Sequence, residues 1–303
     1  MRFSIWPSVG QPWHEVVDTV RHAEATGWDR VYLADHFMAN SADRAEAAAP
    51  LLEATAALSA LAALTDRIVL APLVLGMTYR HPAVVANWAA TVDHVSNGRL
   101  VLGLGAGWQV NEHEQYGIEL PAPGPLVSRF HEGLRVIEGL LTQESTTVAG
   151  DHYRVTEALC EPKPVQSRVP LLVGCTGERM LGIVARHADE WNMWGLPDRV
   201  AERSAVLDRQ CEKVDRDPAS VQRSCQALWF VSDDGDAARA EAAASPARAA
   251  VGGAPADLVE MVEAWQAVGV DEVIVPDFTL GSGARKRELM DAVIEVTAAT
   301  TRG

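Results

Sequence analysis

The chain has 303 residues, of which 48% are hydrophobic and 22% charged, and its formal net charge is −15. This is the composition of a globular protein with enough apolar material for a sizeable core. The acidic excess, 41 Asp and Glu against 26 Lys and Arg, argues against nucleic-acid partners, whose phosphates such a field repels. No apolar run approaches the roughly 20 residues that cross a bilayer, so no membrane segment is expected.

The N-terminal stretch MRFSIWPSVGQPW lacks the basic region and the long apolar core of a secretory signal. The four cysteines, Cys160, Cys175, Cys211 and Cys225, form neither a CxxC pair nor a zinc-like spacing. The nine histidines show no HxH or HExxH pattern, so no metal site is expected. These features predict reduced thiols and a cytoplasmic location.

Short apolar runs alternate along the chain with longer amphipathic segments. Strands are predicted at 2–6, 30–34, 67–76, 97–107, 169–174, 190–194, 224–232 and 271–275. Helices are predicted at 12–26, 50–65, 81–96, 130–141, 177–188, 199–214, 257–269 and 285–300. Gly27 is expected to cap the first helix, and Pro82 to lie in the first turn of the third.

Three segments break this alternation. Residues 108–125 are rich in Pro and Gly and are predicted to form a loop, so that His113, between two glutamates, is expected in solvent. Residues 145–155 are predicted to form a small hairpin. Residues 233–255 are Ala-rich and of low complexity, and are expected to be partly irregular.

Eight strand–helix units predict an α/β fold, a single (β/α)8 TIM-barrel domain over residues 1–303 with insertions after strands 4 and 7. A Rossmann-like sheet is the alternative, but the first strand–helix unit carries no GxGxxG loop. The chemistry of a barrel gathers at the carboxyl ends of its strands. Here those ends carry an aromatic, weakly charged set of residues, which suits a flat aromatic cofactor better than a metal.

Three strand ends carry candidate site residues, each with a plainer alternative. The second strand ends on Asp35 and His36, which either meet solvent or enter a pocket. Small residues in GLGAGWQVNE either let a ligand approach the backbone or relieve crowding between strands. In VGCTGERM, free amides at the start of a helix near Gly177 or Glu178, with Arg179, form either an anion site or a tight turn. No GxSxG motif points to acyl transfer, and Cys175 is a minor catalytic option.

Five stretches resemble the bacterial-luciferase-like superfamily (LLM class), and within it the F420- or FMN-dependent oxidoreductases. They are ADHF, RIVLAPLVLGMTYRHPAVVAN, GRLVLGLGAGWQVNEHEQYG, VGCTGERMLGIVARHADEWN and GVDEVIVP, in matching order over nearly the whole chain. The resemblance implies an eight-stranded barrel, usually a homodimer, that binds FMN or the deazaflavin F420 at its C-terminal mouth.

The resemblance also implies roles for single residues. A bulge with a non-proline cis peptide falls at Pro72-Leu73, and Ala106, Gly107 and Trp108 lie beside the cofactor. The phosphate-binding segment corresponds to Gly174, Cys175, Thr176, Gly177, Glu178 and Arg179. Asp35 and His36 match the pair that places a histidine near the hydride-accepting carbon.

One departure concerns the substrate. Trp108 stands where the sugar-phosphate dehydrogenases of the superfamily have a glutamate, and a tryptophan cannot exchange protons, so that reaction is not expected. Trp6, Trp108, Trp194 and Trp229 are candidate walls of an apolar pocket, although tryptophans serve as often in packing.

Three functions fit these features. The first is an F420-dependent oxidoreductase that transfers a hydride to or from a small apolar substrate, with His36 as proton donor or acceptor. The second is an FMN-dependent monooxygenase that uses oxygen and a reductase supplying reduced flavin. The third is a non-catalytic barrel that acts as a binding protein.

Overall fold

The computed structural model describes residues 1–245 and 248–300. By its internal contacts the chain divides into two compact units. The first unit comprises residues 1–8, 12–32 and 175–303, and the second comprises residues 9–11 and 33–174. None of the helices in the described ranges is long and apolar enough to cross a membrane.

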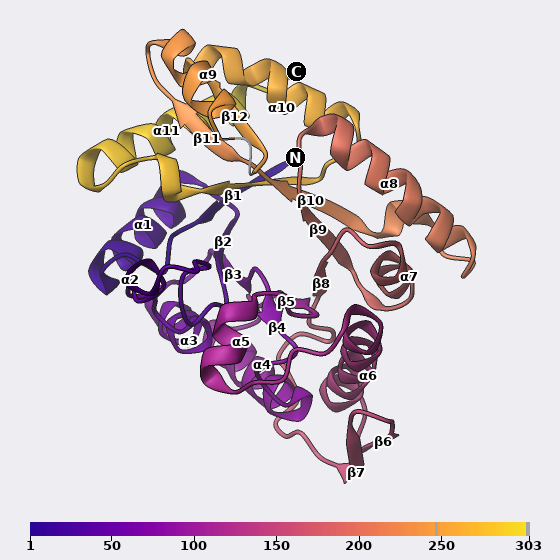
Figure 1. Cartoon of the computed structure of the whole chain (residues 1–303). Helices are drawn as coiled ribbons and strands as arrows, with labels where there is room; N and C mark the ends of the chain where they lie inside the picture. Colours follow the sequence, from indigo (N-terminus) through magenta and orange to yellow (C-terminus); the bar gives the residue numbers. More distant parts are fainter. Residues whose placement is uncertain (246–247, 301–303) are drawn as a thin grey trace. The chain divides into compact units, whose positions relative to one another are not determined.

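Five parallel strands form the main sheet of the first unit. They are β1 (Arg2–Trp6), β2 (Arg30–Leu33), β9 (Glu190–Trp194), β10 (Gln222–Gln226) and β13 (Glu272–Pro276). Their order is β2, β1, β13, β10, β9. Four of them, β2, β1, β10 and β9, are labelled in Figure 1. The register pairs Trp6 with Pro276 and Gln226 with Trp194, so the carboxyl ends of neighbouring strands lie at one edge of the sheet.

The described residues of the first unit form six α-helices. They are α1 (Trp13–Thr26), α7 (Glu178–His187), α8 (Pro197–Glu212), α9 (Gly235–Ala243), α10 (Leu258–Ala267) and α11 (Gly283–Thr300). The predicted C-cap of α1 is confirmed: Gly27 has φ 90°, and its amide donates to the Ala23 carbonyl.

The second unit contains β3 (Val69–Pro72), β4 (Leu75–Gly76), β5 (Leu102–Gly105) and β8 (Leu171–Gly174). β5 lies between β8 and β4, parallel to both, and a bridge from Leu70 to Leu100 places β3 beside the entry to β5. The prediction of one strand over 67–76 is wrong, because β3 and β4 are separate. The Leu73–Val74 peptide between them is cis, one residue after the predicted Pro72-Leu73 position.

The glycines of β5 make room for this interruption. A Cβ on Gly103 would lie 2.1 Å from the Pro72 carbonyl oxygen, and one on Gly105 would lie 2.6 Å from Val74 Cγ2. At these two positions the structure favours relief of crowding between strands over ligand approach.

Five helices complete the second unit: α2 (Arg44–Ala47), α3 (Ala54–Leu64), α4 (Pro82–Ser96), α5 (Val110–Tyr116) and α6 (Pro123–Thr142). The loop predicted over 108–125 is wrong, since it contains α5, capped by Gly117 at φ 66°, and the start of α6. Pro123 and Pro125 lie in the first turn of α6, where a missing N–H costs nothing. The predicted hairpin is confirmed as β6 (Thr146–Ala149) and β7 (Arg154–Ala158).

The predicted seventh strand also divides in two. After β10 the chain continues as β11 (Leu228–Val231), which pairs with β12 (Ala250–Gly253) in a small parallel sheet. Much of the segment expected to be irregular is therefore ordered as α9 and β12. Its residues 246–247 lie outside the described residues. A Cβ on Gly252 would lie 2.1 Å from the Ala238 carbonyl, so the glycine lets α9 pack directly on β12.

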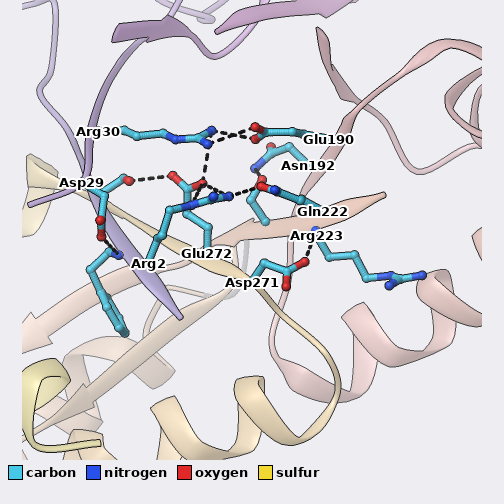
Figure 2. Close-up of polar contacts among 12 residues, drawn as sticks. Arg2, Asp29, Arg30, Glu190, Asn192, Gln222, Arg223, Asp271 and Glu272 are labelled. Atoms are coloured by element: carbon cyan, nitrogen blue, oxygen red, sulfur yellow. Dashed lines mark hydrogen bonds and ion pairs between the residues drawn. The ribbon is translucent and has the colours of Figure 1, made fainter. Parts of the chain in front are cut away.

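A buried polar cluster occupies the amino-terminal ends of the strands in the first unit (Figure 2). Arg30 donates to both oxygens of Glu190 at 2.6 and 3.0 Å. Glu272 is fully buried and accepts from Ser4 at 2.6 Å and from Tyr32 at 3.0 Å. Such an arrangement at the amino-terminal face is structural, since barrel chemistry lies at the opposite end.

Candidate active site

His36 follows β2 and is held by a buried carboxylate of the second unit. Its Nδ1 lies 2.8 Å from Glu112 Oε1, and its side chain is 27% exposed. Glu112, on α5, is fully buried and accepts at Oε2 from the Phe37 amide at 2.8 Å. The Tyr79 hydroxyl also donates to Glu112 Oε1. The expectation that the segment around Glu112 and His113 lies in solvent is wrong.

These contacts determine the charge states of Glu112 and Tyr79. Burial by itself would raise the pKa of Glu112, but hydrogen bonds from His36, Tyr79 and the Phe37 amide outweigh it and lower that pKa. Burial, and then the bond to Glu112, raise the pKa of Tyr79 well above its ordinary value. At neutral pH, Glu112 is therefore an anion and Tyr79 a neutral donor.

Asp35 lies next to His36 but faces other groups. Its carboxylate is 3% exposed and accepts from both terminal nitrogens of Arg80, at 2.7 and 2.8 Å, and from the Gly76 amide at 2.9 Å. Arg80 also donates to Glu53. A buried carboxylate in a bidentate ion pair orients its loop and is not placed to exchange protons.

The segment after β5 places an aromatic ring beside His36. Trp108 is 58% exposed and meets His36 edge to face, with ring centroids 5.6 Å apart. Ala106 and Gly107 precede it, and Gly107 has φ 102° with its missing Cβ position only 2.7 Å from Thr78 Oγ1. Pro72 and Leu73 are buried, and the Leu73 amide donates to the Leu33 carbonyl at 2.8 Å.

The predicted phosphate segment lies at the end of β8 and the start of α7. Gly174 and Cys175 are half-buried, whereas Thr176, Gly177, Glu178 and Arg179 are exposed. Gly177 is the N-cap of α7 with no side-chain cap bond, and a Cβ there would meet nothing within 4 Å. The unobstructed backbone at Gly177 leaves room for a phosphate, whereas the negative charge of the Glu178 side chain would repel one.

Cys175 does not have the properties of a nucleophile. Burial raises the pKa of its thiol to about 12, so the reactive thiolate is scarce at neutral pH. Its carbonyl accepts from Trp191 Nε1 at 2.8 Å. The minor catalytic option for Cys175 is therefore disfavoured.

The remaining predicted wall residues lie in the first unit. Trp6 and Trp194 have ring centroids 5.7 Å apart, and Phe278 lies 5.2 Å from Trp6, so these three rings form one aromatic cluster. Trp229 is fully buried and stacks on Trp265 at 6.0 Å. The position of Trp229 favours the packing alternative over a place in a pocket wall.

A protein-family model described as "Luciferase-like monooxygenase" matches residues 1–301. The chain belongs to this luciferase-like family. A curated relative, the F420-dependent glucose-6-phosphate dehydrogenase of Nakamurella multipartita, is 34% identical over 176 residues, 58% of this chain and 50% of the relative. The match thus spans about half the length of that relative.

Solved structures of luciferase-like fold agree over almost the whole chain. A coenzyme F420-dependent tetrahydromethanopterin reductase from Methanopyrus kandleri superposes with a TM-score of 0.81 and 18% identity, covering 96% of both chains. A riboflavin lyase solved with modified FMN and riboflavin gives a TM-score of 0.83 at 13% identity, covering 99% of this chain and 92% of the other. At these identities the likeness shows the fold, and it confirms the predicted TIM-barrel class. The single-domain assignment stays a prediction.

The structure brings three further residues to this candidate site that the sequence did not predict: Glu112, Tyr79 and Arg80. Glu112 was visible in NEHEQYG, whose final Gly117 is a helix C-cap signal that indicates a short helix in place of a loop. No sequence signal identifies Tyr79 or Arg80, because their partners lie 33 and 45 residues away.

Proposed function

We propose that the chain is an F420-dependent oxidoreductase in which His36 donates or accepts the proton that accompanies hydride transfer. The observation that carries this proposal is the bond from His36 Nδ1 to the buried, anionic Glu112, 2.8 Å long, which leaves the rest of the ring partly exposed. A histidine suits the role because its proton exchange falls in the physiological range.

One ring nitrogen of His36 is available for proton exchange with a substrate. With Nδ1 bonded to Glu112, Nε2 is the nitrogen left to face a substrate. When bound, a deazaflavin supplies or takes up the hydride. In the reductive direction the carbonyl carbon gains the hydride, and its oxygen gains a proton from Nε2 of His36 in its imidazolium form. The products are an alcohol and a neutral ring protonated at Nδ1. Imines and activated alkenes would take up the hydride and the proton in the same way.

The residues proposed to hold the cofactor lie in two stretches. In the second unit, Leu73, Ala106, Gly107 and Trp108 would border the ring, with Pro72 buried behind it. The segment 174–179 is proposed separately, from the resemblance, as a phosphate-binding stretch that would use the backbone amides at the start of α7 and the side chain of Arg179. The open space at Gly177 fits such a group.

An apolar substrate is proposed because Trp108, whose ring meets His36 edge to face, is largely exposed, as are Val110 and Tyr116 of the following helix. Trp108 is 58% exposed, Val110 54% and Tyr116 57%. The nearby cation, Arg80, is engaged by Asp35 and Glu53. Among these residues no unpaired positive charge is left to bind the phosphate of a phosphorylated sugar.

The second candidate is an FMN-dependent monooxygenase, favoured by the structural likeness to the riboflavin lyase solved with modified FMN. It would need oxygen and a reductase that supplies reduced flavin. A binding protein without catalysis is the third. Oxygen consumption with FMN and a reductase separates the second candidate from the first, and failure to bind either cofactor would favour the third.

We also propose a homodimer, and a cytoplasmic location in which its cysteines stay reduced; all four are free in the structure.

The proposed role of His36 is tested by turnover of reduced F420 with a panel of apolar ketones, aldehydes, imines and activated alkenes. His36→Ala should lower turnover by about 100-fold or more while F420 affinity stays within about twofold. His14→Ala, which removes an exposed histidine of α1, is the matched control and should change neither. Unchanged turnover in His36→Ala would reject the assignment.

A further inference from the structure

Three hydrogen-bond donors converge on the carboxylate of Glu112. His36 Nδ1, at 2.8 Å, and the Tyr79 hydroxyl share Oε1, whereas the Phe37 amide, also at 2.8 Å, occupies Oε2. The carboxylate is fully buried, so water does not compete for these bonds. Glu112 therefore depends on these donors for the solvation of its charge.

The helix that carries Glu112 is itself fixed on both sides. The next residue, His113, is buried, with Nδ1 2.6 Å from the Gln109 carbonyl and Nε2 2.8 Å from Thr78 Oγ1. Thr78 and Tyr79 are adjacent on the segment between β4 and α4. The same short segment thus anchors α5 through Thr78 and contacts its carboxylate through Tyr79.

We propose that Glu112 and Tyr79 are positioning residues for His36. Glu112 holds the neutral imidazole in the form protonated at Nδ1. Tyr79 donates to the same oxygen of Glu112 and so weakens the hydrogen bond between His36 and Glu112. The inference rests on the proposed function of His36, but its test does not require activity. Because an anionic carboxylate can only accept, the His36 nitrogen facing it must donate, as in a catalytic triad.

The two residues have opposite effects on the hydrogen bond between His36 and Glu112. The negative charge of Glu112 strengthens the bond from His36 Nδ1, and the hydroxyl of Tyr79, which donates to the same oxygen, disperses part of that charge. The other charged groups nearby, Asp35 and Arg80, pair with each other. Removing the charge of Glu112 should therefore weaken the Nδ1–H hydrogen bond of His36, and removing the Tyr79 hydroxyl should strengthen it.

The test is nitrogen-15 NMR of the histidine rings in the purified, cofactor-free chain. Wild-type His36 is expected to carry its neutral-form proton on Nδ1, and Glu112→Gln is expected to lose that preference. A wild-type ring protonated on Nε2 would overturn the inference even if Glu112→Gln fails to fold. The matched control is Glu132→Gln, which removes another carboxylate that accepts backbone amides, those of residues 151–153.

The role of Tyr79 is tested by the proton chemical shift of the His36 Nδ1–H group, which moves downfield as its hydrogen bond strengthens. Tyr79→Phe should move this signal downfield, and Glu112→Gln should move it upfield. Tyr153→Phe removes a buried hydroxyl that accepts from Arg129 at 3.0 Å and should leave the signal unchanged. An unmoved signal in Tyr79→Phe, or an equal shift in Tyr153→Phe, would show a purely structural role and overturn the assignment.

Discussion

Asp35 and His36 are neighbours on the chain, but their side chains meet different surroundings. Asp35 is enclosed by Arg80 and the Gly76 amide, so its charge is neutralised within the loop. His36 has one nitrogen on Glu112 and the rest of its ring partly exposed. The carboxylate of Asp35 is thus fully engaged by protein groups, whereas His36 keeps part of its ring exposed.

Arg80→Ala is predicted to destabilise the chain by about 3–5 kcal/mol, because it leaves the buried carboxylate of Asp35 without its ion partner. Urea unfolding followed by circular dichroism measures this change. Arg44→Ala, at an exposed position on α2, serves as the control and should stay within about 0.5 kcal/mol of the wild type. An equally small effect of Arg80→Ala would contradict the structural role given to the Asp35–Arg80 pair.

For single residues, the sequence predicts where a side chain lies along the fold better than it predicts which residues that side chain contacts. An apolar run that stops beside His36 predicts that residue at a strand end, and it lies three residues beyond Leu33, the last residue of β2. Its bond to Glu112 joins residues 76 apart in the sequence, and the Asp35–Arg80 pair joins residues 45 apart. Such contacts depend on how loops fold over strand ends, which periodicity does not encode.

The short helix α5 is the element on which the candidate site depends. It carries Glu112 to His36 and His113 to Thr78, and it begins two residues after Trp108. The turn that leads into it requires a glycine, since Gly107 has φ 102° and packs against Thr78. The position of Trp108 therefore follows from the backbone at Gly107.

Gly107→Ala should destabilise the fold by roughly 1–2 kcal/mol and displace Trp108, because an L-residue resists positive φ and the new Cβ would crowd Thr78 Oγ1. Thermal unfolding and the tryptophan fluorescence spectrum report the two effects. Gly124→Ala, where a Cβ would meet nothing within 4 Å, should be neutral. Equal stability of the two variants would contradict this account of the turn.

The regular elements were predictable from apolar periodicity, and most strands and helices lie where expected. The misassigned elements have physical reasons. The predicted strand 67–76 is interrupted between β3 and β4. The glycines of the neighbouring strand β5 leave the space that the interruption needs, and this packing between strands is not encoded in the local periodicity. β12 was missed because AVGG has weak strand propensity and forms only by pairing with β11.

The charge of the whole molecule bears on its self-association. A chain of net charge −15 repels its own copy unless the contact faces carry little charge. α3 and α4 offer such a face, because none of their exposed residues is Asp, Glu, Lys or Arg; Asp93 of α4 is fully buried. Val84 and Val95 are exposed there by 61% and 47%.

The proposed homodimer is therefore expected to use α3 and α4, and light scattering coupled to size exclusion should give twice the chain mass. Val84→Glu should shift the protein to monomer by placing like charges in the contact. Leu159→Glu, at another exposed apolar position, should leave the dimer intact. A monomeric wild type, or dissociation by both variants, would reject this interface.

The central claim, that this luciferase-like chain works with a deazaflavin, is tested most directly by cofactor binding. Purified protein is titrated separately with F420 and with FMN, and binding is followed by the fluorescence of each cofactor. F420 is expected to bind at micromolar concentration or tighter, and FMN is expected to bind more weakly. Tight binding of FMN with no binding of F420 would contradict the central claim.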